Sequence, residues 1–208
     1  MLIEPQEKRL FTLFDCQNLF HACKNAWGYQ RANFDPLKLS RLLQRDHLDW
    51  KFEKTHLYTG IHRQDIHPEL HHFWTKKLEL LEKSPQVTCV TRPLRYTECD
   101  GKKIAREKGI DVRIALDLVR LARTGAFDVA VIFSQDNDFR EVADEIRAIA
   151  KEFDRWIKIV SAFPDASGPN NLPQRGIEHT DWIRISKKDY DQCIDKNDYS
   201  LPCLPQPL

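Results

Sequence analysis

Short apolar runs alternate along the chain with segments whose apolar residues recur every three or four positions. The runs predict buried strands at residues 10–14, 55–59, 87–91, 127–133 and 157–163, with an edge strand at 182–185. The spaced segments predict helices at residues 35–44, 68–81, 110–122 and 139–149. Strands that alternate with helices predict an α/β fold of three layers with a mostly parallel central sheet.

The two ends of the chain differ from this alternating region. We expect an N-terminal extension at residues 1–8, one domain at 9–186, and a polar, proline-rich C-terminal tail at 187–208 that is poorly ordered. No stretch reaches the roughly 18–20 consecutive apolar residues of a membrane span, and no apolar signal core follows Met1. The sequence therefore predicts a cytoplasmic protein with no membrane partner.

Acidic residues follow two of the predicted strands and open one of the predicted helices. Asp15 follows the first strand, Asp136 and Asp138 follow the strand at 127–133, and Asp111 opens a helix. Ligands of an open parallel sheet gather outside the carboxyl ends of its strands. Clustered carboxylates repel one another unless a cation lies between them. The pattern therefore predicts a Mg²⁺ or Mn²⁺ site held by these four acids.

Each of these acids also has a simpler interpretation. Asp136 or Asp138 can cap the helix that follows, and Asp111 can be an ordinary acid in a first helical turn. Asp15 is harder to explain in this way, because a carboxylate directly after five apolar residues needs a partner. The occurrence of such acids at three separate junctions favours the metal site.

Asp117 is a further acid in the same predicted helix as Asp111. Arg113 and Arg120 flank it at helical spacing, so the pattern favours a surface ion pair. A role in the site is the second interpretation of this residue.

Three blocks of the sequence resemble the NYN domain of the PIN-like nuclease superfamily. They are FDCQN at 14–18, KGIDV at 108–112 with Asp117 after it, and SQDNDF at 134–139. The family pattern is D-x-x-N, then K-G-x-D-V followed by a second Asp, then S-x-D-x-D-F, on a Rossmann-like sheet. The resemblance spans about residues 9–186. It departs at Gln135, where the family commonly has Gly, and this difference can alter the turn.

The resemblance implies a PIN-like fold and a Mg²⁺- or Mn²⁺-dependent endoribonuclease that hydrolyses RNA phosphodiester bonds. It also implies roles for individual residues. The catalytic and metal-binding acids would be Asp15, Asp111, Asp136 and Asp138, with support from Asn18, Ser134 and Asp117.

Basic residues concentrate just before Asp111, with Tyr96 among them. They are Arg92, Arg95, Lys102, Lys103, Arg106 and Lys108. Such a segment can contact phosphates while an aromatic side chain stacks on a base, which suits single-stranded RNA better than duplex RNA. The simpler interpretation is a solvated loop, partly neutralised by nearby acids. A net charge of +1 excludes a protein that coats nucleic acid by bulk charge.

Other function classes stay open at this point. A non-catalytic RNA-binding or regulatory module would keep the same fold, and a DNA nuclease would use the same chemistry. A phospho-accepting receiver domain usually needs paired acids near the end of its first strand, where this chain has only Asp15. A Rossmann oxidoreductase is disfavoured because no G-x-G-x-x-G follows that strand. The sequence leaves open whether the chain forms a homo-oligomer.

Overall fold

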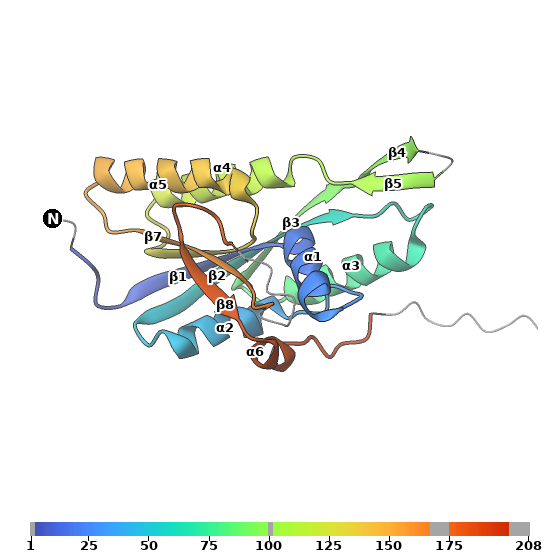
Figure 1. Ribbon diagram of the computed structural model, residues 1–208, viewed down its shortest axis with the longest axis horizontal. Coiled ribbons are helices and arrows are strands. Elements are labelled where there is room, and N and C mark those ends of the chain that lie inside the picture. The colour runs from blue at the N-terminus through green and yellow to red at the C-terminus, as the bar shows by residue number, and fades with distance from the viewer. Residues whose placement is uncertain (1–2, 100–101, 167–174, 200–208) are drawn as a thin grey trace, which may run out of the picture.

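Six parallel strands form one central sheet in a computed structural model, which describes residues 3–99, 102–166 and 175–199 (Figure 1). The strands are β1 (Lys8–Asp15), β2 (Trp50–Ile61), β3 (Val87–Pro93), β6 (Val129–Phe133), β7 (Lys158–Pro164) and β8 (Asp181–Ile185). Their order is β3-β2-β1-β6-β7-β8. Two further strands, β4 (Arg95–Cys99) and β5 (Lys102–Arg106), pair antiparallel and are called the β4–β5 ribbon below.

Helices cover both faces of the sheet, which confirms the predicted α/β fold of three layers (Figure 1). The α-helices are α1 (Cys16–Trp27), α2 (Pro36–Asp46), α3 (Pro68–Leu81), α4 (Ile110–Arg123), α5 (Arg140–Glu152) and α6 (Lys187–Gln192). Helices α4 and α5 share one apolar core with the sheet, and the other four share the second core on the opposite face. A short 3₁₀ turn, Asn137–Phe139, precedes α5.

Strands β1 and β6 lie side by side at the centre of the sheet, where the strand order reverses direction. Their residues alternate between the two cores, as Phe14 and Leu13 illustrate. Phe14 pairs in register with Phe133, and the two rings stack with centroids 4.0 Å apart. This stacking fixes the two strand ends relative to each other. A crevice at such a reversal is the usual ligand site of an open parallel sheet.

The structure adds elements that the hydrophobic pattern did not predict. Helix α1 follows β1 directly, and its buried face consists only of Cys16, Leu19 and Cys23. The basic segment before α4 is the β4–β5 ribbon instead of a plain loop. Strand β2 extends well beyond the predicted 55–59, because it pairs with β1 along the whole of that strand.

The C-terminal segment 187–199, called the C-terminal strap below, packs against the domain. The prediction that order is lost from residue 187 onward is wrong for this segment, since Tyr190 and Cys193 are buried in the core. Lys77 on α3 is fully buried and its Nζ lies 2.6 Å from Oδ2 of Asp195. The prolines at 202, 205 and 207 lie outside the described residues. Among the described helices, none is long and apolar enough to span a bilayer.

Candidate functional site

Asp15 stands where β1 passes directly into α1, at the centre of the sheet. Its carboxylate caps the helix: the backbone N–H of Asn18 donates to Oδ1 at 3.1 Å. The hydroxyl of Ser134, at the end of β6, donates to Oδ2 at 3.3 Å. Asp15 is only 7% exposed, so these two donors replace most of its contact with water. Capping and a place in the site are therefore compatible for this residue.

Ser134 and Asn18 connect the end of β6 to the start of α1. The backbone N–H of Gln135 donates to Oδ1 of Asn18 at 2.9 Å, and that of Asp136 donates to Oγ of Ser134 at 3.1 Å. These bonds place Asp136 beside Asp15. Gln135 has no positive φ, so the turn does not require the glycine common in the family.

A cavity of about 480 Å³ lies at the carboxyl ends of β1 and β6, and we call it the acid cavity. Asp15, Asp111 and Asp136 all line it, although they come from three separate segments. Asp111 is in the first turn of α4, whose N-cap is Gly109. The structure therefore brings together three of the four acids on which the sequence-based metal site depends.

Glu107 is a fourth acid in the wall of the acid cavity, and the sequence analysis did not select it. Its Oε1 accepts a hydrogen bond from the backbone N–H of Gly60, at 2.6 Å. A Cβ at Gly60 would lie 2.2 Å from Cδ2 of Leu94 and 2.7 Å from Oε1 of Glu107, so a larger residue would have to displace these two side chains. The one sequence signal is that Glu107 directly precedes the KGIDV block.

Burial of carboxylates near one another raises their affinity for protons. Burial raises the pKa of Asp15 to about 6, with smaller contributions from Asp136 and Asp111, although the Asn18 and Ser134 hydrogen bonds oppose the shift. Burial also raises the pKa of Glu107 to about 7, and Asp15 and Asp111 add to the effect. The acid cavity is thus a place where negative charge is costly without a counter-charge.

Asp138 and Asp117 do not line the acid cavity. Asp138 is exposed, and its backbone N–H donates to Oδ1 of Asp136 at 3.1 Å, so the residue orients Asp136 through its main chain. Asp117 is buried and its Oδ2 accepts from Arg113 at 2.8 Å and from Tyr58 at 3.2 Å. The ion pair with Arg113 is present as the spacing indicates, but Asp117 is inside the fold instead of on its surface.

Most of the predicted substrate-binding residues have no carboxylate partner among the described residues. Arg92, Arg95, Lys103, Arg106 and Lys108 are exposed, and within residues 3–99, 102–166 and 175–199 none forms an ion pair. Lys108 also lines the acid cavity. The side chain of Lys102 is not among those that the structure describes.

Tyr96 has a structural role in the ribbon. Its hydroxyl lies 3.0 Å from Nδ1 of His62, and its ring stacks on His67 with centroids 6.0 Å apart. These contacts attach the β4–β5 ribbon to the start of α3. One face of the ring is therefore already covered by His67.

The donor set of the acid cavity is suited to a hard divalent cation, because carboxylate oxygens are the ligands that Mg²⁺ and Mn²⁺ prefer. In the part of the chain that the structure describes, no three His, Cys, Asp or Glu side chains are grouped closely enough to hold an ion on their own. Magnesium usually keeps several water ligands and uses one or two carboxylates. The residues present therefore fit an ion bound partly through water.

Comparison with known proteins supports the fold and shows the family of the chain. A solved structure of a Vibrio parahaemolyticus protein of unknown function is similar to this chain, with a TM-score of 0.56 and 17% sequence identity. The match covers 90% of this chain and 98% of that one. At this identity the similarity supports the fold alone. No curated protein matches the chain significantly. The family model of the NYN domain matches residues 9–166, which include all three blocks and every acid of the cavity. The chain therefore belongs to the NYN domain family, a family of PIN-like nuclease domains.

Proposed function

We propose that this protein is a metal-dependent endoribonuclease that hydrolyses phosphodiester bonds of single-stranded RNA at the acid cavity. One observation carries the proposal: acids from three separate segments line a single cavity where the strand order reverses. The NYN family supports RNA as the substrate, and PIN-like nucleases typically use divalent metals. Asp15, Asp111 and Asp136 would hold Mg²⁺ or Mn²⁺, which would polarise the phosphodiester and make a bound water more acidic.

The protein's own groups would orient the reaction. Asn18 and Ser134 hold the Asp15 carboxylate in one orientation, and Ser134 also positions the backbone of Asp136. Lys108 at the cavity wall offers a positive charge to an incoming phosphate. Such preorganised groups stabilise developing charge without reorganising during the reaction.

Glu107 is suited to move a proton in this reaction. Its Oε1 is engaged by the Gly60 N–H, which leaves Oε2 as the atom that can carry or accept a proton. Burial raises its pKa to about 7, which brings this group closer to neutral pH than an ordinary carboxylate. We assign it the transfer of a proton from the attacking water or to the leaving oxygen.

Asparagine variants of the cavity acids test the proposal. We expect Asp15→Asn, Asp111→Asn and Asp136→Asn each to lower the rate of RNA cleavage with Mn²⁺ by at least about 100-fold. Asp138→Asn should have a smaller effect, because its backbone bond to Asp136 is retained. Glu141→Gln is the matched control, since Glu141 is an exposed acid in the first turn of the neighbouring α5.

The measurement is cleavage of end-labelled RNA and of DNA of the same sequence, with and without a chelator. Chelator-sensitive cleavage that the three asparagine variants abolish supports the proposal. Cleavage that survives all three substitutions would rule it out. Cleavage of DNA in preference to RNA would change the substrate but keep the chemistry.

A non-catalytic RNA-binding module is the second candidate function. It is favoured by the absence of a ready-made three-ligand cluster among the described residues. This candidate predicts that the protein retains RNA without turnover in Mg²⁺, Mn²⁺ and other divalent metals. The same gel assay, run beside a binding measurement, separates the two candidates.

A further inference from the structure

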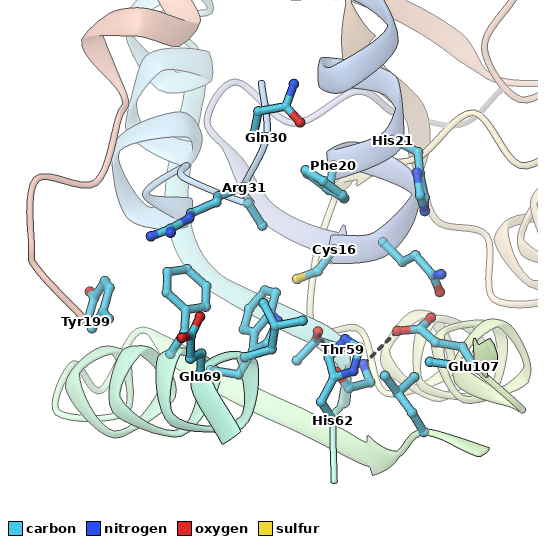
Figure 2. A pocket seen from close by; sticks show the side chains of 18 residues that line it. Cys16, Phe20, His21, Gln30, Arg31, Thr59, His62, Glu69, Glu107 and Tyr199 are labelled. Atoms are coloured by element: carbon cyan, nitrogen blue, oxygen red, sulfur yellow. Dashed lines mark hydrogen bonds between the residues drawn. The ribbon is translucent and has the colours of Figure 1, made fainter. Parts of the chain in front are cut away.

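A larger cavity of about 680 Å³ lies next to the acid cavity, and no step of the proposed chemistry uses it. It lies between α1, the segment after α1 and the start of α3, as Figure 2 shows. We call it the aromatic cavity because four aromatic rings line it. These are Phe20, Phe73, Trp74 and Tyr199. Its volume lies within the range of about 300–1,000 Å³ that is typical of small-molecule sites.

The two cavities share part of their walls. Gln17, His21 and Glu107 line both of them. In Figure 2 the carboxylate of Glu107, which accepts from Gly60, stands at one end of the aromatic cavity and Tyr199 stands at the other. A molecule whose reacting phosphate occupied the acid cavity would therefore have the aromatic cavity beside it.

The aromatic cavity combines apolar surface with a few polar groups. Phe20 is partly buried on α1, and Trp74 is 8% exposed on α3. Thr59 and His62 add hydrogen-bonding groups. Flat apolar walls with edge-directed polar groups are what a nucleobase requires, because a base stacks through its faces and hydrogen-bonds through its edge.

Arg31 lies at the end of the aromatic cavity opposite Glu107 (Figure 2). It is exposed and forms no ion pair with any described residue. A guanidinium group in this position can bind a phosphate through two parallel hydrogen bonds. The aromatic cavity thus has the acid cavity next to one end and, at the other end, a cation that suits a second phosphate.

We propose that the aromatic cavity binds one nucleobase of a single-stranded RNA, namely the base next to the phosphodiester held at the acid cavity, with Arg31 binding the following backbone phosphate. The proposal rests on the proposed function for the identity of the neighbouring phosphate. It makes the aromatic cavity the place where the enzyme selects single strands, because a base paired in a duplex cannot enter it.

Binding of two matched ligands to the full chain, measured in chelator so that no cleavage occurs, tests the proposal. The probes are a short fluorescent single-stranded RNA and a ribose-phosphate backbone of the same length without bases. We expect the intact RNA to bind roughly 5- to 100-fold more tightly, as stacking of one base would give. Equal affinities would overturn the proposal.

Single substitutions localise the effect. Phe20→Leu keeps apolar volume but removes the ring, so it should weaken binding of the intact RNA and leave the base-free backbone unchanged, while Phe20→Tyr should behave like the wild type. Phe153→Leu is the matched control, because Phe153 is 44% exposed and lies outside the cavity. A Phe20→Leu protein that folds and still prefers the intact RNA by the full factor would also overturn the proposal.

Arg31→Gln should weaken both probes and reduce the slope of log Kd against log salt by about 0.7, as expected for one lost contact to a single strand. Arg184→Gln on the edge strand β8 is the control, since Arg184 lies outside both cavities. An unchanged slope in Arg31→Gln would remove Arg31 from the proposal.

The base site and the nuclease activity can each be absent without the other, and the experiments distinguish the two cases. Metal-dependent cleavage that needs Asp15 but is indifferent to Phe20 would keep the nuclease and reject the base site. Base-dependent binding that needs Phe20 without cleavage in any metal would keep the base site and reject the nuclease.

Discussion

At the scale of single residues, Glu107 shows how the fold uses a carboxylate that the sequence presents as ordinary. In the sequence it is one acid among several in a basic stretch. In the structure the main chain of Gly60 donates to it at 2.6 Å, and the side chain is partly buried. Its role depends on a close approach between two segments that are 47 residues apart, which no local pattern reports.

Glu107 should make the stability of the protein depend on pH in a defined direction. Burial raises its pKa from the usual 4.5 to about 7. The folded state therefore binds the proton more tightly than the unfolded state. The stabilisation from this group is complete below about pH 4.5 and is lost as the pH rises to about 7. A divalent ion in the acid cavity would offset that loss at high pH.

The test is Glu107→Gln, which keeps an oxygen that can accept from Gly60 but cannot ionise. We compare the free energy of unfolding of the variant with that of the wild type at each pH. This difference should favour the variant by roughly 1–3 kcal/mol more at pH 8 than at pH 4.5. Urea denaturation at both pH values without metal measures it, with Glu98→Gln on the exposed ribbon as control. The same pH dependence in Glu107→Gln as in wild type would contradict the assignment.

At the scale of elements, the β4–β5 ribbon has a built-in charge conflict. Arg95 pairs directly with Arg106 in the ribbon register, so both side chains lie on the same face. Like charges in this position destabilise a ribbon unless an anion lies between them. Tyr96 attaches the other face to His62 and His67. The ribbon is therefore held in place with its cationic face free for a backbone phosphate.

Replacing both arginines should weaken RNA binding without changing base preference. For Arg95→Gln with Arg106→Gln we expect the slope of log Kd against log salt to fall by about 0.7 for each lost phosphate contact. The free protein should be as stable as the wild type or slightly more stable. Arg123→Gln serves as control, because Arg123 is paired with Glu152 on the neighbouring helix. An unchanged slope in the double variant would show that the ribbon does not contact the RNA.

The elements also show which patterns predict structure and which do not. Helices α4 and α5 were predicted within a few residues because each buries a continuous apolar stripe. Helix α1 was missed because its buried face is short and two of its three buried residues are cysteines. The β4–β5 ribbon was missed because its strands carry mostly charged and polar residues and contribute none of the buried residues of either core.

At the scale of the whole molecule, the alternation of strands and helices was enough to predict the sheet, because both faces of a parallel sheet must be covered. It also predicted that acids after different strands would meet, which holds for Asp15 and Asp136. The alternation could not show that Asp138 lies outside the acid cavity. Asp138 is two residues after Asp136, and the direction of its side chain depends on the 3₁₀ turn at Asn137–Phe139. Glu107 and the aromatic cavity depend on contacts between distant segments, which a linear pattern does not contain.

The C-terminal strap connects the stability of the whole molecule to the aromatic cavity. Lys77 is fully buried on α3, bonds to Asp195 of the strap, and lies 5.5 Å from the ring centre of Tyr199, which lines that cavity. Nζ of Lys77 also donates to the carbonyl of Phe34 at 2.8 Å. A buried charge whose partner is removed is far more costly than the pair itself. The strap should therefore behave as part of the domain and unfold with it.

Asp195→Ala should lower the free energy of unfolding by about 3–5 kcal/mol, because it leaves the Lys77 charge buried and unpaired. The double variant Lys77→Met with Asp195→Leu should recover most of that loss, since apolar side chains can fill the same space. Lys76→Ala is the control, because its pair with Glu79 is of similar length, 2.8 Å, but both partners are about half exposed. We expect this variant to lose no more than about 0.5 kcal/mol. Urea denaturation followed by tryptophan fluorescence measures the free energy of unfolding of all three variants. If Asp195→Ala lowers it no more than Lys76→Ala does, the strap is not an integral part of the fold.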